Sequence, residues 1–348
     1  MKQSIHTNHK IASQNKEAKS CTACWALLRV RTVAFCFAKQ GGFMSSLWTE
    51  NIEMPEFPTL EKDIRTQVLI IGGGMAGVLC AYFLQQAGVD YCLLEKDRIC
   101  QGVTGHTTAK ITAQHGLIYE KSLQSMGQER AELFLKANLR AVENYKNLGR
   151  FLDCDMEETD SYLYSVRERR KLESEIQALG SLGFQADYTE DTELPFEVEG
   201  AIRFPRQAQF QPLKFAAGIS KNLRIYEHSE VREMTEYFAL TEKGSVAAEK
   251  IIIATHFPFI NTRGSYYLKL YQNRSYVLAC AYGKNLKGMY LEADNIGLSL
   301  RNYEDYLLIG GGGHRSGKEK NNWDLLRDIA KEYFPEAKER YFWATQDC

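Results

Sequence analysis

The residue pattern with the clearest chemical meaning in this sequence is a glycine-rich turn, Gly72-Gly-Gly-Met-Ala-Gly77. Gly72 permits a tight turn off a strand, Gly74 lets the backbone approach a pyrophosphate, and Gly77 lets the next helix pack closely on a sheet. A pyrophosphate would lie on the amides at the helix N-terminus, where unpaired N–H groups and the helix dipole favour an anion. The pattern therefore predicts a dinucleotide site.

The elements around this turn form the strand–helix–strand unit that such a site requires. Continuous apolar residues at 67–71 and 89–94 predict two buried parallel strands, and residues 78–87 predict a helix between them that Gly88 ends. Glu95 follows the second strand, where a carboxylate can accept hydrogen bonds from both ribose hydroxyls. A glycine-rich turn without a ligand is the weaker interpretation, because strand, glycines, helix and acid all agree.

A second polar loop, residues 102–110, offers further groups to the same ligand. Thr104, Thr107 and Thr108 carry hydroxyls, and Gly105 an unobstructed amide, for phosphate or ribityl oxygens. An ordinary threonine-rich turn is the alternative.

In the rest of the chain, the sequence predicts mainly helices first and mainly strands later. Helices are predicted at 117–152, 168–179, 212–220 and 323–333, and strands at 161–166, 200–212, 223–226, 230–235, 237–240, 250–255, 275–282, 288–291, 297–301 and 306–309. We expect Gly180 and Gly183 to break the second of these helices. For the run Gly310–Gly313, a flexible hairpin is the preferred interpretation, because no helix follows that would make it a phosphate site.

Composition excludes several classes of protein. With 348 residues and a net charge of −1, the chain has room for a sizeable core and no excess charge that would favour nucleic acid. The nine cysteines are scattered, which predicts reduced thiols and a cytoplasmic location. Cys21 and Cys24 form a lone pair without further ligands, so no metal site is expected.

The N-terminal residues match no folded pattern. The apolar stretch 25–38 contains Arg29 and Arg31 and is too short for a membrane span. Residues 1–63 are interpreted as an extension and lead-in arm, disordered to about residue 43 or translated from a start codon placed too early.

From about residue 64 to 348, the chain resembles the FAD-dependent oxidoreductases of the D-amino-acid oxidase, glycine oxidase and sarcosine oxidase superfamily. The resemblance rests on the glycine turn with Glu95-Lys96, on the loop 102–110, and on Ile251-Ile-Ile-Ala-Thr255, where the family has a strand that ends in Ala-Thr-Gly. His256 replaces that glycine, which leaves the geometry of the turn open. Within the superfamily, the chain most resembles a bacterial branch whose members often carry a C-terminal Rieske iron–sulfur domain.

The resemblance implies an α/β fold in which a Rossmann-like FAD-binding domain is interleaved with a mostly antiparallel substrate domain. The expected division is 64–153 and 206–262 for the FAD-binding domain, and 154–205 and 263–348 for the substrate domain. The segment that caps the flavin in the family, and the Rieske signature, are not found before Cys348, so the chain resembles a truncated form. We expect it to bind FAD weakly.

The implied cofactor is FAD, with a Rieske 2Fe-2S cluster only in longer relatives. The candidate FAD-binding residues are Gly72, Gly74, Met75, Ala76, Gly77, Glu95, Lys96, Gly102, Thr104, Gly105, His106, Thr107, Thr108, Val231, Ala254 and Thr255. A histidine in a similar context carries the flavin covalently in sarcosine and dimethylglycine dehydrogenases. Because the residues around His106 match that context only in part, a non-covalent hydrogen bond to the flavin is favoured over a covalent link.

No catalytic residue can be named from the sequence, and four residues are weak candidates: Arg274, Tyr276, Arg301 and His314. An arginine could bind a substrate carboxylate and a histidine could relay a proton, although a surface charge is the commoner role of an arginine at a strand end.

The favoured function is oxidation of an amine or amino-acid-like small molecule by hydride transfer to flavin, with oxygen or a redox partner as electron acceptor. The alternatives are an NAD(P)-dependent Rossmann dehydrogenase and a non-catalytic remnant of the flavoenzyme.

Overall fold

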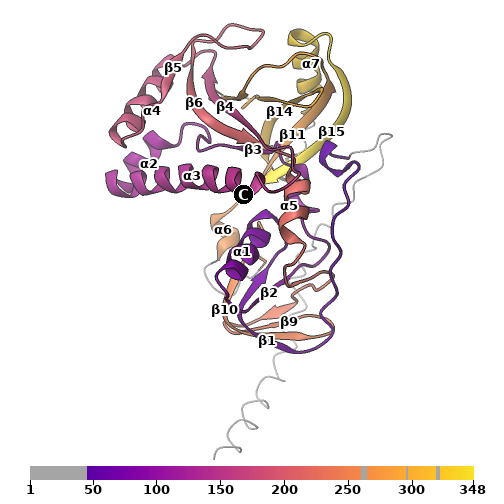
Figure 1. Ribbon diagram of the computed structural model, residues 1–348. Coiled ribbons are helices and arrows are strands. Elements are labelled where there is room, and N and C mark those ends of the chain that lie inside the picture. The colour runs from indigo at the N-terminus through magenta and orange to yellow at the C-terminus, as the bar shows by residue number, and fades with distance from the viewer. Residues whose placement is uncertain (1–44, 260–264, 295–296, 319–321) are drawn as a thin grey trace, which may run out of the picture. The chain divides into compact units, whose positions relative to one another are not determined.

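A computed structural model describes residues 45–259, 265–294, 297–318 and 322–348, so the prediction for residues 1–43 lies outside the described residues (Figure 1). Among the described residues, no helix combines the length and the apolar character that crossing a membrane requires.

A six-stranded sheet carries the glycine-rich turn. Its central strand β1 (Ile64–Ile71) pairs in parallel with β2 (Tyr91–Leu94) and with β10 (Ser245–Ile253). Leu69 and Ile70 of β1 are fully buried, as the continuous apolar run predicts for a strand covered on both faces. The remaining strands are β7 (Ile225–Tyr226) beside β2, and β9 (Phe238–Leu240) and β8 (Glu233–Met234) beside β10.

A nine-stranded, mostly antiparallel sheet forms the second layer, which confirms the predicted fold class. Its order is β15 (Lys338–Asp347), β11 (Asn273–Ala281), β14 (Tyr306–Arg315), β13 (Ser299–Tyr303), β12 (Met289–Glu292), β4 (Glu157–Ser165), β6 (Gly200–Gln209) and β3 (Lys110–Ile111), with β5 (Asp187–Thr189) also paired to β6. Strand β6 continues past residue 206, the expected domain boundary. Strand β3 falls within the segment 64–153 that was expected in the FAD-binding domain, and it also pairs in this sheet.

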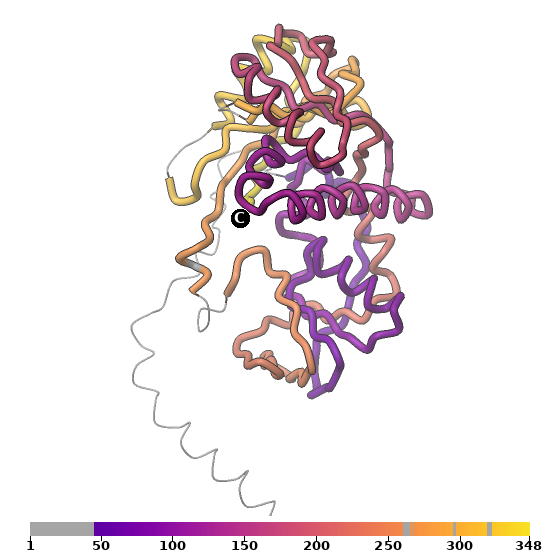
Figure 2. The backbone as a smooth tube through the Cα atoms, turned by 90° about the vertical axis from the view of Figure 1, so that its left-hand side faces the viewer, coloured from indigo at the N-terminus to yellow at the C-terminus, as the bar shows by residue number. Residues whose placement is uncertain are grey.

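The helices connect and cover the two sheets (Figures 1 and 2). They are α1 (Met75–Gln86), α2 (Tyr119–Met126), α3 (Gln128–Gly149), α4 (Arg169–Ser181), α5 (Pro212–Ser220), α6 (Tyr266–Lys269) and α7 (Trp323–Tyr333), with short 3-10 turns η2 (Leu47–Thr49) and η3 (Val103–His106). The helical region predicted at 117–152 is interrupted at Gly127, which has a φ of 78°. Gly180 does not break α4, because the helix continues through it to Ser181.

The expectation of a hairpin at Gly310–Gly313 is wrong. These residues continue strand β14, where Gly310 pairs with Val277 of β11 and with Ser299 of β13. Thr108 of the loop 102–110 lies against Gly310, where an added Cβ would be at an ordinary contact distance of 3.4 Å, whereas Gly312 has a φ of 65° and a Cβ there would lie 2.9 Å from Cβ of Asn322.

The two faces of the nine-stranded sheet have different coverings. Leu278 and Ile309 belong to a core that includes Leu326 of α7, whereas Val277 and Leu308 belong to the core shared with the α1 side of the molecule. Because side chains alternate along a strand, each strand supplies both cores.

Candidate functional site

Three predicted cofactor residues meet at one edge of the parallel sheet. Ile71 lies opposite Leu94 on one side and Ile253 on the other, so β1, β2 and β10 end at the same level. Gly72, Glu95 and Ala254 directly follow these strand ends. The carboxyl end of a parallel sheet is where this class of fold binds its ligands.

The glycine turn has the geometry that its sequence predicts. Gly72 has a φ of 107°, and a Cβ at that position would lie 2.6 Å from the carbonyl oxygen of Ala254. A Cβ at Gly77 would overlap the carbonyl oxygen of Gly72. At Gly74, by contrast, an added Cβ would meet no atom nearer than the Thr104 hydroxyl at 3.7 Å. The turn is therefore tight on its inner side and open where a ligand would approach.

Glu95 lies on this turn. Its carboxylate accepts the Gly73 amide at 2.6 Å and the Asp97 amide at 3.0 Å. Lys96, also predicted to contact the cofactor, forms an exposed ion pair with Asp97 (3.5 Å), and Val231 is buried in the core beside β1 and β2.

The turn after β10 accommodates the unexpected histidine. His256 has a φ of 64°, in the left-handed region that a glycine adopts easily. A residue with a Cβ in this conformation lowers the stability of the fold by about 1–2 kcal/mol relative to glycine, so replacing the family's glycine by His256 carries this cost. The hydroxyl of Thr255, a predicted cofactor residue, donates to the carbonyl of Phe257 at 2.9 Å.

The loop 102–110 is held by side chains that are distant in sequence. The carbonyl of Gly105 accepts from Ser46 Oγ, that of His106 from Trp343 Nε1 (2.9 Å), that of Thr107 from Trp48 Nε1 (2.6 Å), and that of Ala109 from Arg301 Nη1. In a planar trans peptide, the N–H of the next residue points away from the carbonyl. These four contacts therefore turn the following amides away from the side chains that hold the loop.

The same loop crosses the face of the nine-stranded sheet strand by strand. His106 contacts Trp343 of β15, Thr108 lies against Gly310 of β14, Ala109 contacts Arg301 of β13, and the Lys110 ammonium donates to the carbonyl of Tyr290 of β12 at 2.6 Å. The loop thus packs on this face of the sheet, and its residues Thr107, Ala109 and Lys110 also border an open space.

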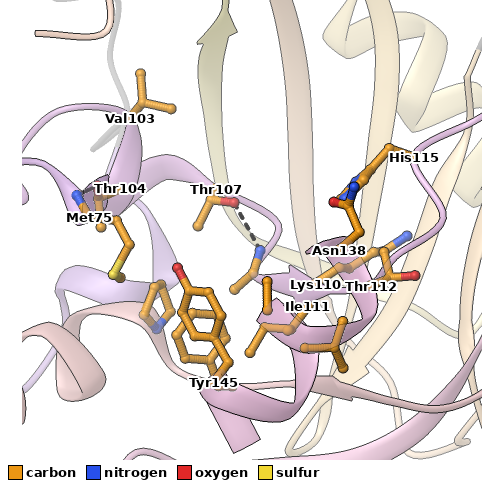
Figure 3. A pocket seen from close by; sticks show the side chains of 15 residues that line it. Met75, Val103, Thr104, Thr107, Lys110, Ile111, Thr112, His115, Asn138 and Tyr145 are labelled. Carbon is orange, nitrogen blue, oxygen red and sulfur yellow. Dashed lines mark hydrogen bonds between the residues drawn. The ribbon is translucent and has the colours of Figure 1, made fainter. Parts of the chain in front are cut away.

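That space is a cavity of about 420 Å³ (Figure 3). It begins at Met75 and Thr104, beside the N-terminus of α1, and extends to Lys110 and His115 at the other end. Apolar groups of α3 and α5 line its walls, among them Val142 and Pro212. If the glycine turn binds a dinucleotide as the sequence predicts, this cavity adjoins the place for its far half and for a substrate.

The far end of the cavity is lined by one cationic side chain, that of Lys110, and Arg301 lies near it outside the lining. Burial, with a smaller effect of Arg301, lowers the pKa of Lys110 to about 7. Burial also lowers the pKa of Arg301, whose Nη2 atom has no hydrogen-bond partner among the described residues. Burial lowers the pKa of His115 as well, so its imidazole is neutral at pH 7.

The four weak catalytic candidates lie in two places. The Tyr276 hydroxyl is 2.9 Å from Nε2 of His314, and the Arg274 guanidinium lies 6.0 Å from the Tyr276 ring centre. Tyr276 makes an edge contact with Trp323 of α7, so this group lies on the α7 face of the sheet and does not line the cavity. Arg301 is fully buried beneath the loop, 5.4 Å from the Trp48 ring centre, where it positions the backbone.

The comparison with protein families agrees with this geometry. The family model "DAO: FAD dependent oxidoreductase" matches residues 67–346. The chain belongs to this family.

Its relatives include enzymes and a protein named for an iron–sulfur cluster. YhfW of Bacillus subtilis (strain 168), named for a Rieske 2Fe-2S cluster, is 32% identical over 332 residues, which cover 89% of this chain and 65% of YhfW. The chain thus spans just under two thirds of that relative. Two solved structures share the fold: glycine oxidase of Geobacillus kaustophilus (17% identity, 81% of this chain and 82% of that one, TM-score 0.65) and L-proline dehydrogenase of P. horikoshii (18%, 83% and 82%, TM-score 0.66).

Sequence reasoning missed Lys110, Trp48 and Trp343 as site residues. Lys110 lies within the loop that the sequence singled out, but nothing in its neighbours marks it as buried. The two tryptophans act over separations of 59 and 237 residues, for which a single sequence offers no signal. Among the described residues, no group of three or more histidine, cysteine or acidic side chains could hold a metal ion.

Proposed function

We propose that the chain oxidises an amine or amino-acid-like substrate by hydride transfer to FAD. Membership of the FAD-dependent oxidoreductase family supports the cofactor, and relatives of the same fold named for glycine and L-proline support the substrate class. The observation that carries the proposal is the cavity that begins at the glycine turn and ends at Lys110 and His115.

The residues present fit FAD. The open side of Gly74 and the N-terminus of α1, where the Met75 amide donates to the Thr104 hydroxyl at 3.0 Å, suit the diphosphate. Glu95 would exchange its bonds to the turn for bonds to the adenosine ribose, and Thr104 and the loop amides would face the ribityl chain and the flavin. Val231, buried in the core beside β1 and β2, suits the adenine side of the site.

The bound flavin supplies the chemistry by accepting a hydride from the substrate carbon. The protein residues bind, orient and exclude water. Val142, Tyr145 and Phe210 make the wall of the cavity apolar, and burial raises the pKa of Tyr145 to about 12, so its phenol stays neutral. Lys110 and Asn138 leave donors at the far end, where a polar substrate group can be held.

The FAD is bound without a covalent link in this proposal. His106 Nδ1 is 2.8 Å from the carbonyl of Gly102, and the residue does not line the cavity. A ring held within its own loop is suited to support the loop. Acid precipitation should release all the yellow colour into the supernatant, whereas colour that stays with the precipitate would contradict this.

The test uses the purified chain. We expect flavin absorbance bands, and bleaching of those bands when amines or amino acids are added without oxygen. A colourless protein that binds NADH would support a nicotinamide dehydrogenase, and a colourless protein that binds neither would support a remnant. Flavin occupancy also measures whether binding is weak, and oxygen consumption distinguishes oxygen from a redox partner as acceptor. A cytoplasmic location, which the free thiols of the described cysteines fit, is part of this proposal.

A further inference from the structure

One charged side chain lines the cavity. Of the lining residues in the described part of the chain, Lys110 alone can carry a full charge at neutral pH, because His115 is neutral and the others are apolar, hydroxyl or amide groups. No aspartate or glutamate lines the cavity there.

Lys110 is half-buried, and its ammonium has more hydrogen-bond donors than partners. It has three N–H donors, of which one reaches the Tyr290 carbonyl, and among the described residues it forms no ion pair. Its charged neighbour is a second cation, Arg301, which has an unsatisfied buried nitrogen. Lys146, by comparison, is more deeply buried than Lys110 and pairs with the carboxylates of Glu143 and Glu158. No carboxylate pairs with Lys110 among the described residues, although Glu157 acts on its neighbour Arg301, so the one charged group that lines the far end of the cavity is a cation.

We propose that Lys110 binds the carboxylate of the substrate. The inference rests on the proposed function, since it assigns a role to one end of the same cavity. That end lies opposite Met75 and Thr104, where the cofactor would enter, so Lys110 is placed for the substrate (Figure 3). Asn138 and Thr112 lie beside it and can donate further hydrogen bonds.

Such a role makes binding depend on pH. The groups around the ammonium are Arg301 from β13, which stays charged, His115 and Tyr145, which stay neutral, and Glu157 of β4, which acts mainly on Arg301. Lys110, with a pKa of about 7, is thus the group that titrates near neutrality. A carboxylate binds the protonated form, so its affinity falls above pH 7, and binding draws a proton from solution.

Calorimetry of the purified full chain tests this, with benzoate as the carboxylate probe and benzamide as its neutral counterpart. Buffers of different ionisation enthalpy report the protons taken up. The variants are Lys110→Met, which removes the charge, Lys110→Arg, which keeps a charge that does not titrate near pH 7, and the control Lys214→Met. Lys214 pairs with Asp155 at 2.8 Å and does not line the cavity.

We expect benzoate to bind with uptake of about half a proton at pH 7. Lys110→Met should weaken benzoate about 10- to 100-fold and leave benzamide unchanged, Lys110→Arg should bind benzoate without proton uptake, and Lys214→Met should match the parent. Equal benzoate affinity in Lys110→Met overturns the proposal. So does a loss confined to FAD affinity, which would assign the cation to the cofactor. Flavin absorbance of the same samples tests the proposed function separately.

Discussion

The indole of Trp48 offers a sharp test of the way in which the loop 102–110 is held. Trp48 is fully buried, and its Nε1 donates to the Thr107 carbonyl at 2.6 Å. Trp48→Phe keeps one six-membered aromatic ring, so the edge contact with Tyr303 (4.9 Å) and the position under Arg301 are kept in part. The variant removes the pyrrole ring with its N–H donor, which leaves a small cavity and a buried carbonyl unsatisfied.

An unsatisfied buried acceptor costs about 1–3 kcal/mol. If the loop forms its binding geometry only with that carbonyl held, much of this cost falls on FAD binding, and about 1.4 kcal/mol corresponds to a tenfold loss of affinity. We therefore expect FAD to bind Trp48→Phe about tenfold more weakly, measured by quenching of flavin fluorescence during reconstitution.

A matched control is Trp323→Phe. Trp323 Nε1 also donates to a backbone carbonyl, that of Trp343 at 3.2 Å, but its ring lies on the α7 face. Both variants should lower the free energy of unfolding, and only Trp48→Phe should lower FAD affinity further. Equal effects of the two variants on FAD affinity would refute the reasoning.

Three further predictions follow from the same geometry. Gly77→Ala places a methyl group on the Gly72 carbonyl, so it should cost about 1–3 kcal/mol in unfolding experiments and abolish flavin retention during gel filtration. Tyr276→Phe removes the bond to His314, and neither residue lines the cavity, so the rate of anaerobic flavin reduction should change less than about twofold, which corresponds to about 0.4 kcal/mol in the activation free energy. Lys110 has a pKa of about 7 in the folded protein and about 10.4 in the unfolded chain, so the unfolded chain binds more protons between these pH values. The free energy of unfolding, measured by denaturant titration, should therefore rise by up to about 1.4 kcal/mol per pH unit from pH 7 to 10. Lys110→Met should remove this slope.

The features that could be predicted from the sequence are local ones. The turn at Gly72–Gly77 and its flanking strands follow from apolar runs and from glycine conformations, which depend on neighbouring residues, and Pro212 begins α5 for the same reason. The glycine run at 310–313 misled because a glycine with a positive φ can stand in an irregular strand as well as in a turn: Gly312 has a φ of 65° within β14, whose pairing with β11 and β13 the sequence did not specify.

The part of the site formed by the strand ends of the parallel sheet could be predicted from the sequence, whereas the cavity lined by the loop 102–110 could not. Gly72, Glu95 and Ala254 follow strand ends that must align in a parallel sheet. Lys110 could not be recognised, because its burial depends on strands that begin much later in the chain. Tyr276 and Arg301 were candidates from the sequence but do not line the cavity. Which face of the sheet a strand residue occupies depends on the pairing register, which the sequence did not specify.

The contacts of the loop with β12 to β15 have a consequence for folding. Residues 106–110 reach their positions through partners as distant as Trp343, so the loop cannot be ordered until the last strand of the sheet has paired. Contacts of such long range form late and slowly, after local elements. The glycine turn, made by residues 64–95 and strand β10, can form earlier. During synthesis, the appearance of bound flavin would therefore report that β15 has paired with β11.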